Sequence, residues 1–247
     1  MGRVATVGAR QDYVHGYSGR ERERLTDQAD TLAELLHSDT LYPSGSVVLE
    51  VGCGVGAQTV TLARRSPEDV RRDGQRAFDP PDSGTWRFSR PTSCFVLEHL
   101  SRPREALAHL GRVLKPGGTI TVIEGDHGSA YYHPDSRHAI RCLIELQARA
   151  GGASLIGRTL YPLLVNAGFR HVTVSPRMVY VDSSRPQLVE GFTKNTFTAM
   201  VEGVRERTLA AGLIDDETWA KGIRDLYRTA EADGTFCYTF FKAVATT

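Results

Sequence analysis

Hydrophobic residues follow two different spacings along the chain. Between residues 20 and 37 they recur three or four positions apart, which predicts an amphipathic helix. Residues 47–51 instead form a short apolar run that ends at a cluster of glycines, which is typical of a buried strand. A second helical stretch follows this cluster and reaches about Arg65. Strands and helices in alternation predict a doubly wound α/β fold with a mainly parallel sheet.

The same alternation continues to the end of the chain. A helix predicted over residues 103–114 is stopped by Lys115-Pro116-Gly117-Gly118, because lysine favours the last helical turn and proline and glycine end it. The other segments are predicted as strands at 93–97, 119–124, 171–181 and 235–245, and as helices at 135–150, 157–167 and most of 187–230. The late helical stretch before the closing strand is expected to form a cap over the sheet.

Composition narrows the classes of partner. The 247 residues carry a formal net charge of +1, so charge gives no reason to expect nucleic acid or an anionic membrane as a partner. The apolar runs are strand-sized and the first residues lack the apolar core of a secretory signal, so we expect a cytoplasmic protein. The four cysteines are scattered without metal-ligand spacing, and we expect neither a metal site nor a disulfide framework.

The glycine cluster after the first strand is the strongest indication of a ligand site. Glu50 is followed by Gly52, Gly54 and Gly56, and a glycine turn at the carboxyl end of a strand lets backbone approach a ligand closely. A phosphate-binding P-loop needs Gly-Lys-Ser/Thr at its end, which this turn lacks. A nicotinamide oxidoreductase is the second enzymatic interpretation, but the third glycine comes one residue too early for it.

Two motifs carry a resemblance to a known family. VLEVGCGVG resembles the first motif of class I S-adenosylmethionine-dependent methyltransferases, and CFVLEHLSRPREALAHLGRVLKPGGTITVIEGD resembles the fourth strand, helix and fifth strand of their quinone-biosynthesis-like branch. More narrowly, YVHGYS, IEGDHGS and FCYTFFKAVA are similar to a bacterial small-molecule subgroup that includes the C-methyltransferase of teleocidin biosynthesis. The resemblance implies a Rossmann-like fold and S-adenosyl-L-methionine as cofactor.

The resemblance also implies a set of cofactor-binding residues. Glu50 would orient the turn and the methionine end of the cofactor. The other implied residues lie in the glycine turn and at the end of the fourth strand of the family: Gly52, Cys53, Gly54, Gly56, Cys94, Phe95, Val96 and Leu97. Plain sheet core is an equal alternative for residues 95–97, and we expect Glu98 to be a surface or helix-capping charge.

Residues 66–93 depart from the family pattern. These 28 residues would have to supply two strands and two helices, yet each strand takes about five residues and each crossover at least about ten. We therefore expect the second and third strands to be missing or degenerate, with one flank of the first strand exposed. A deletion or a change of reading frame would explain the composition. No acidic residue there is assigned to the cofactor ribose, and cofactor affinity is expected to be weakened.

The substrate side is expected to combine one histidine with aromatic residues. His127 is the candidate general base or polar contact, because a neutral imidazole accepts a proton near neutral pH, and Asp126 is a candidate substrate contact. An ordinary loop histidine is the alternative. The aromatic candidates are Tyr17 as a catalytic lid residue and Tyr13, Tyr131 and Tyr132 as substrate-binding walls, with loop packing or a tail as the alternatives.

These features predict a methyltransferase acting on a small molecule. The acceptor is expected among secondary metabolites, including prenylated or aromatic compounds, with carbon, nitrogen and oxygen all open as the methylated atom. The alternative is a methyltransferase-like remnant with weak or no catalysis that serves as a binding or oligomerisation module; a homo-oligomer stays open. The predicted organisation is an N-terminal helical lid (1–42), a cofactor-binding core (43–182), a helical cap (183–233) and the final strand of the core sheet (234–247).

Overall fold

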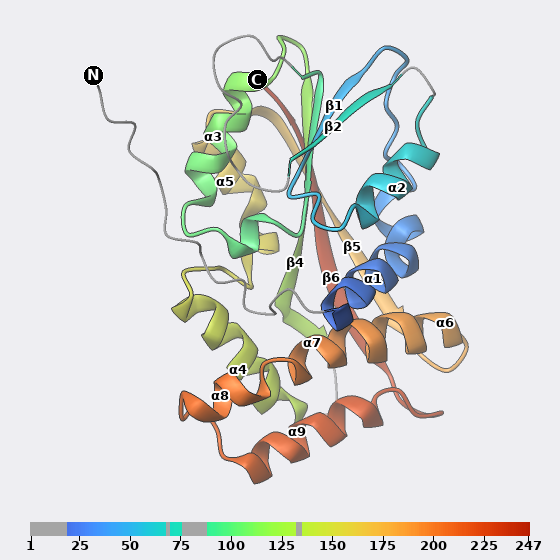
Figure 1. Ribbon diagram of the computed structural model, residues 1–247, viewed down its shortest axis with the longest axis vertical. Helices are drawn as coiled ribbons and strands as arrows, with labels where there is room; N and C mark the ends of the chain where they lie inside the picture. Colours follow the sequence, from blue (N-terminus) through green and yellow to red (C-terminus); the bar gives the residue numbers. More distant parts are fainter. Residues whose placement is uncertain (1–18, 68–69, 76–87, 132–134) are drawn as a thin grey trace.

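The computed structural model describes residues 19–67, 70–75, 88–131 and 135–247, and within them the chain folds around one mixed sheet (Figure 1). Six described strands lie in the order β2-β1-β3-β4-β6-β5. The first four in this order are parallel to one another, and β6 runs antiparallel to both β4 and β5. The strands are β1 (Val47–Val51), β2 (Arg71–Gln75), β3 (Arg90–Cys94), β4 (Thr119–Tyr131), β5 (Arg170–Val181) and β6 (Phe236–Thr246).

Helices cover both faces of this sheet, as the alternating pattern predicts. In Figure 1, α3 and α5 lie on one face, α1 and α2 lie on the other, and α4 and α6–α9 gather beyond the end of β4. The helices are α1 (Gly19–His37), α2 (Ala57–Arg64), α3 (Pro103–Val113), α4 (Ser136–Arg149), α5 (Leu160–Asn166), α6 (Pro186–Leu188), α7 (Ala199–Glu202), α8 (Arg205–Ala210) and α9 (Asp216–Arg228), with the 3-10 segments η1 (Leu97–His99) and η2 (Ile156–Thr159) and the π-helix η3 (Val189–Thr198).

The flank of the first strand is covered, contrary to the sequence-based expectation. Strand β2 pairs with β1 in parallel over their whole length, from Val47 opposite Arg71 to Val51 opposite Gln75. The expectation that this flank is exposed is therefore wrong, and the claim that both the second and third strands are missing is not confirmed. The pairing needs only backbone groups, which is why a charged, glycine-containing segment forms it without an apolar run.

The hydrophobic core has two large parts. One packs the sheet against α3 and α5 and includes Leu107 and Leu164, each fully buried. The other lies where β4, β5 and β6 meet α1, α4 and the helices of the cap, and it contains many of the aromatic rings. A third cluster joins β1 to α2 and contains four of the described residues: Tyr42, Val48, Leu62 and Val70. The packing is thus richest at the end of the sheet that carries the cap.

Strand β4 is longer than the apolar run predicts. The pattern ends it at Glu124, whereas the strand continues to Tyr131 and keeps its register with β6 as far as Asp126 opposite Thr239. The two glycines in this stretch favour a loop in the sequence, but Gly125 lies within the strand. Glycine is needed there because a Cβ would overlap the hydroxyl of Tyr238. A glycine inside a strand often marks such a close approach. No helix among the described residues is long and apolar enough to cross a bilayer.

Candidate functional site

The glycine turn lies between β1 and α2 and has the backbone that its sequence predicts. Gly52, Gly54 and Gly56 all have a positive φ, at 71°, 50° and 81°. Residues that carry a side chain rarely adopt such backbone angles. The three positions differ in surroundings. A Cβ at Gly52 would overlap the side chain of Val96, whereas a Cβ at Gly54 would meet only the carbonyl oxygen of Gly52 at 3.8 Å. The space beside Gly54 is open, as a ligand cradle requires.

Glu50, in β1, contacts the helix that follows the glycine turn. Its side chain is buried, and its carboxylate accepts a hydrogen bond from Thr59 Oγ1 in the first turns of α2. Burial raises the pKa of this carboxyl, and the hydrogen bond from Thr59 lowers it. The contact orients the turn, which agrees with one half of the role that the resemblance implies. Cys53 is half-buried within the turn.

The segment after β3 turns sharply into η1. The strand ends at Cys94, three residues earlier than the predicted end at Leu97, and Phe95 has a φ of 59°. A bulky residue in the left-handed region is strained, and such strain is concentrated at functional sites. Leu97 is fully buried in the core that faces α3, so for this residue the structure agrees with the core alternative.

One carboxylate fixes this strained segment. Glu124 Oε1 accepts hydrogen bonds from the backbone N–H groups of Val96 at 3.0 Å and Leu97 at 2.8 Å. Its other oxygen, Oε2, is buried and has no hydrogen-bond partner among the described residues. Burial, with the nearby charge of Glu98, raises the pKa of Glu124 to about 8. Burial and the same two carboxylates also raise the pKa of the Cys94 thiol.

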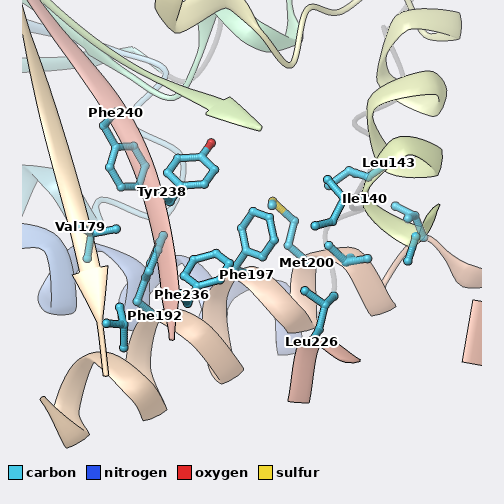
Figure 2. Packing of buried hydrophobic residues seen from close by; sticks show 14 of the residues in the cluster. Ile140, Leu143, Val179, Phe192, Phe197, Met200, Leu226, Phe236, Tyr238 and Phe240 are labelled. Atoms are coloured by element: carbon cyan, nitrogen blue, oxygen red, sulfur yellow. The ribbon is translucent and has the colours of Figure 1, made fainter. Parts of the chain in front are cut away.

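A narrow cavity of about 50 Å³ opens beside this segment, between α1, η1, β4, β6 and the cap. Five of its fourteen lining residues are phenylalanine or tyrosine, and Figure 2 shows Tyr238 and Phe240 of β6 beside Phe192 and Phe197 of η3. An engineered cavity of about 150 Å³ accommodates benzene, so the cavity in this conformation is too small for an aromatic acceptor. The lining residues are Arg24, Leu25, Gln28, Phe95, Glu98, His99, Gly125, His127, Phe192, Thr196, Phe197, Met200, Tyr238 and Phe240.

His127 lies in the wall of this cavity. It is part of β4 rather than of a loop after the strand, and only 4% of its surface is exposed. Its Nδ1 is 2.7 Å from the hydroxyl of Tyr238, and its Nε2 is 3.8 Å from Glu98 Oε2. Burial lowers the pKa of His127, which favours the neutral ring. The position agrees with a polar contact in the site, while the role as general base stays a prediction.

The expectation that Glu98 is a surface charge is wrong. Its side chain is buried in the cavity wall, and Gln147 Nε2 of α4 donates to its Oε2 at 3.5 Å. The second oxygen, Oε1, lies 3.6 Å from His99 Nε2. A helix 49 residues away in sequence therefore covers this carboxylate, which no local pattern around Glu98 indicates.

Asp126 is committed to another contact. Its carboxylate forms a two-pronged ion pair with Arg158, with Nε to Oδ2 at 2.6 Å and the second guanidinium nitrogen to Oδ1 at 2.8 Å. Oδ1 also accepts from the backbone N–H of Gly128 at 3.0 Å. Neighbouring residues of a strand point to opposite faces, so Asp126 points away from the cavity that His127 faces. A substrate contact by Asp126 is not supported by this arrangement.

The predicted tyrosines fall mostly outside the structure described. Tyr13, Tyr17 and Tyr132 lie outside the described residues, and their roles stay predictions. Tyr131 is the last residue of β4, and its backbone pairs with Cys237. Among the described residues, no cluster of histidine, cysteine, aspartate and glutamate has the arrangement of a metal site.

Sequence reasoning missed Tyr238 and Glu98 as site residues. Tyr238 stands between Phe236 and Phe240 on β6, and this spacing of two places all three side chains on one face of a strand. This aromatic alternation could have indicated the site, because an aromatic face at the end of a sheet must pack against another surface. Glu98 follows a strand at its carboxyl end, where ligands bind in this class of sheet.

Comparisons with known proteins agree on the fold. No known protein-family profile matches the chain. The chain is 30% identical over 190 residues to an uncharacterized 37.1 kDa protein in transposon Tn4556 of Streptomyces fradiae, covering 64% of this chain and 54% of that protein. It is 32% identical over 109 residues to an uncharacterized methyltransferase of Mycobacterium tuberculosis, covering 34% of this chain and 54% of that protein. The chain thus spans about half the length of these curated relatives.

A solved structure matches nearly the whole chain. This is the cyclopropane-fatty-acyl-phospholipid synthase-like protein of Lactobacillus casei, with a TM-score of 0.54, 15% identity, and coverage of 96% of this chain and 99% of that one. At this identity the match shows a shared fold. The α/β, Rossmann-like architecture predicted from the sequence is confirmed, and the sheet is mixed because β6 runs antiparallel to its two neighbours.

Proposed function

We propose that this chain catalyses methyl transfer from S-adenosyl-L-methionine to a small-molecule acceptor. The observation that carries the proposal is the glycine turn after β1, whose open space beside Gly54 lies at the same edge of the sheet as the cavity walled by His127. Ligands of open α/β sheets bind beyond the carboxyl ends of the strands, where both features lie. The similarity to a methyltransferase of Mycobacterium tuberculosis supports the same reaction.

The residues present fit the methionine part of this cofactor. The open space at Gly54 and the buried, turn-orienting carboxylate of Glu50 suit close approach of a ligand that carries positive charge. Cys94, Phe95 and Val96 stand across from the turn, and Val96 lies directly against Gly52. When bound, the cofactor supplies an electrophilic methyl group. The chain's own contribution is to orient the acceptor and exclude water from a narrow aromatic cavity.

The proposal also covers the lid, the cap, the class of acceptor and the roles of the tyrosines. Residues 1–42 would act as a lid and residues 183–233 as a cap that shapes the acceptor site, with the acceptor drawn from secondary metabolism and the protein acting in the cytoplasm. The subgroup that includes the teleocidin C-methyltransferase is the proposed affiliation. Tyr17 would close over the cofactor, and Tyr13 and Tyr132 would contact the acceptor.

One observation favours the alternative function, a methyltransferase-like remnant that does not catalyse methyl transfer. Strand β2 ends at Gln75, opposite Val51, where the family places an acidic residue for the cofactor ribose. Binding measurements separate the two proposals: titration calorimetry with S-adenosylmethionine and S-adenosylhomocysteine should give saturable binding in the micromolar range. Absence of binding at millimolar ligand would leave only the remnant.

Replacing Gly54 with valine tests the location of the cofactor. The side chain would fill the open space of the turn, so we expect Gly54→Val to lose S-adenosylhomocysteine binding by at least about 100-fold, a loss of roughly 2.7 kcal/mol. Gly117→Val is the matched control, because Gly117 also has positive φ (73°) and open space, but it precedes β4 at the opposite edge of the sheet. Equal binding by Gly54→Val and the parent protein would move the cofactor elsewhere.

A further inference from the structure

The wall of the cavity contains a buried polar pair that the fold leaves incomplete. His127 Nε2 is buried and has no hydrogen-bond partner among the described residues. It lies 3.8 Å from Glu98 Oε2, which is too long for a hydrogen bond between them. A buried polar atom without a partner costs about 1–3 kcal/mol, so its presence in a cavity wall indicates a place for a ligand group.

Tyr238 determines which hydrogen the pair offers. His127 Nδ1 lies 2.7 Å from the phenol oxygen of Tyr238. We assign the phenol hydrogen to Nδ1, because no other hydrogen bond of this hydroxyl to a side chain is found among the described residues. A neutral imidazole carries one hydrogen, which this contact assigns to Nε2. The pair then presents one donor, Nε2–H, and one acceptor, Glu98 Oε2.

We propose that this pair is a subsite for a hydroxyl group carried by a flat, apolar acceptor molecule. A hydroxyl oxygen accepts one hydrogen bond and donates another, so a single oxygen satisfies both His127 Nε2 and Glu98 Oε2 across their 3.8 Å separation. The apolar body would lie among Phe95, Phe197 and Phe240. The proposal rests on the proposed function only in treating this cavity as the acceptor site.

Other ligand groups complement the pair less well. A carboxylate or phosphate would face the acidic side chain of Glu98, and an ammonium would direct its hydrogens at the Nε2–H of His127. A carbonyl would satisfy His127 and leave Glu98 facing another acceptor. Arg24 also reaches the cavity, but it forms a buried ion pair with Glu21, at 2.6 Å, on its own helix. The hydroxyl is therefore the group that the pair selects.

The cavity must widen to admit such a molecule. Its present volume of about 50 Å³ suits water rather than an aromatic ring. The wall that can yield is η3, a ten-residue π-helix in which Thr196 Oγ1 donates to the carbonyl of Gly191 at 2.7 Å. π-helical segments are rare and are found frequently at functional sites. The fixed wall is β4 and β6, which hold the polar pair.

Three matched probes test the subsite without any cofactor. Titration calorimetry of the full chain with 2-naphthol, 2-methoxynaphthalene and 2-naphthylamine changes only the group offered to the pair. We expect 2-naphthol to bind roughly tenfold more tightly than 2-methoxynaphthalene, which lacks the hydrogen that Glu98 accepts. Equal binding of the three, or preference for the amine, would overturn the proposal. This comparison is made on the parent protein and needs no variant to fold.

Variants then locate the preference. We expect Glu98→Gln to reduce the 2-naphthol preference to less than about threefold, because an amide replaces the acceptor only in part. Thr196→Val is the matched control, since it removes a hydroxyl from the same cavity wall, and it should keep the tenfold preference. A preference unchanged in Glu98→Gln and lost in Thr196→Val would place the hydroxyl elsewhere and refute the subsite. Failure of S-adenosylmethionine to bind would refute the proposed function and leave this result standing.

Discussion

The two halves of the sheet are built in different ways. On one side, β1 and β2 are five-residue parallel strands, and the described residues beside them form a cluster of four buried hydrophobic side chains. On the other, β4, β5 and β6 are 11 to 13 residues long, antiparallel at β6, and packed against the aromatic core. The glycine turn belongs to the first half and the cavity to the second. The cavity therefore lies at the end of the sheet where core residues of the long strands pack against the cap, and the glycine turn lies beside the short strands.

The largest expected difference between the halves is in core packing. Phe236 is fully buried among the rings of Phe192 and Phe197, so Phe236→Ala should lower the free energy of unfolding by about 3–5 kcal/mol. Leu62→Ala, in the small cluster beside β1, should cost about 2 kcal/mol, at the low end for such a change. Urea unfolding measures both. A larger loss for Leu62→Ala would reverse the comparison.

Glu124 of β4 bonds the backbone of the segment after β3, and the free energy of unfolding should depend on pH through this residue. Burial raises the pKa of Glu124 from its ordinary value of 4.5 to about 8, so this carboxyl is protonated in the folded chain well above the pH at which it ionises in the unfolded chain. Its contribution to stability is fully present below pH 4.5 and is lost as the pH rises to about 8. Glu124→Gln cannot ionise and keeps an oxygen for the N–H groups of Val96 and Leu97.

The test is the difference in unfolding free energy between Glu124→Gln and the parent protein. It should be small at pH 4.5 and should grow in favour of the variant by on the order of 3 kcal/mol by pH 8.5. Glu145→Gln is the control, because Glu145 forms an exposed ion pair with Arg149 on α4 and should show little such trend. A difference that shrinks with rising pH would mean that Glu124 is ionised in the folded chain.

The smallest effect concerns local opening. The amides of β2 pair on one side with a short strand, whereas those of β4 lie between two partners. We expect the amides of Arg71–Gln75 to exchange through local opening that costs much less than global unfolding. The amides of β4 should exchange only on global unfolding. Hydrogen exchange followed by mass spectrometry gives both values. Equal protection of β2 and β4 would show that the half with the glycine turn is as stable as the other.

The sequence predicts the regular parts of this fold well. The helix ended by Lys115-Pro116-Gly117-Gly118 is present as α3, and the helices and strands from α4 to β6 lie within a few residues of the predicted bounds. Hydrophobic spacing suffices there, because each element buries one face in the core. The glycine turn is equally predictable, since its positive φ angles demand glycine.

The polar side of the cavity depends on contacts that local patterns do not contain. Glu98 resembles a surface charge until Gln147 covers it, and the continuation of β4 past Glu124 depends on pairing with β6, more than a hundred residues later. Strand β2 is missed for a related reason. The hydrogen bonds of a parallel strand pair join backbone groups, so such a pairing can form without a run of apolar residues in the sequence.

The close approach of Tyr238 to Gly125 has an evolutionary consequence. A side chain at position 125 would overlap the phenol oxygen of Tyr238, so the two positions are a single steric unit formed by residues far apart in sequence. A larger residue at position 125 therefore requires a smaller residue, or a displaced ring, at position 238. Correlated substitution at these two sites would therefore mark lineages in which the site has been remodelled.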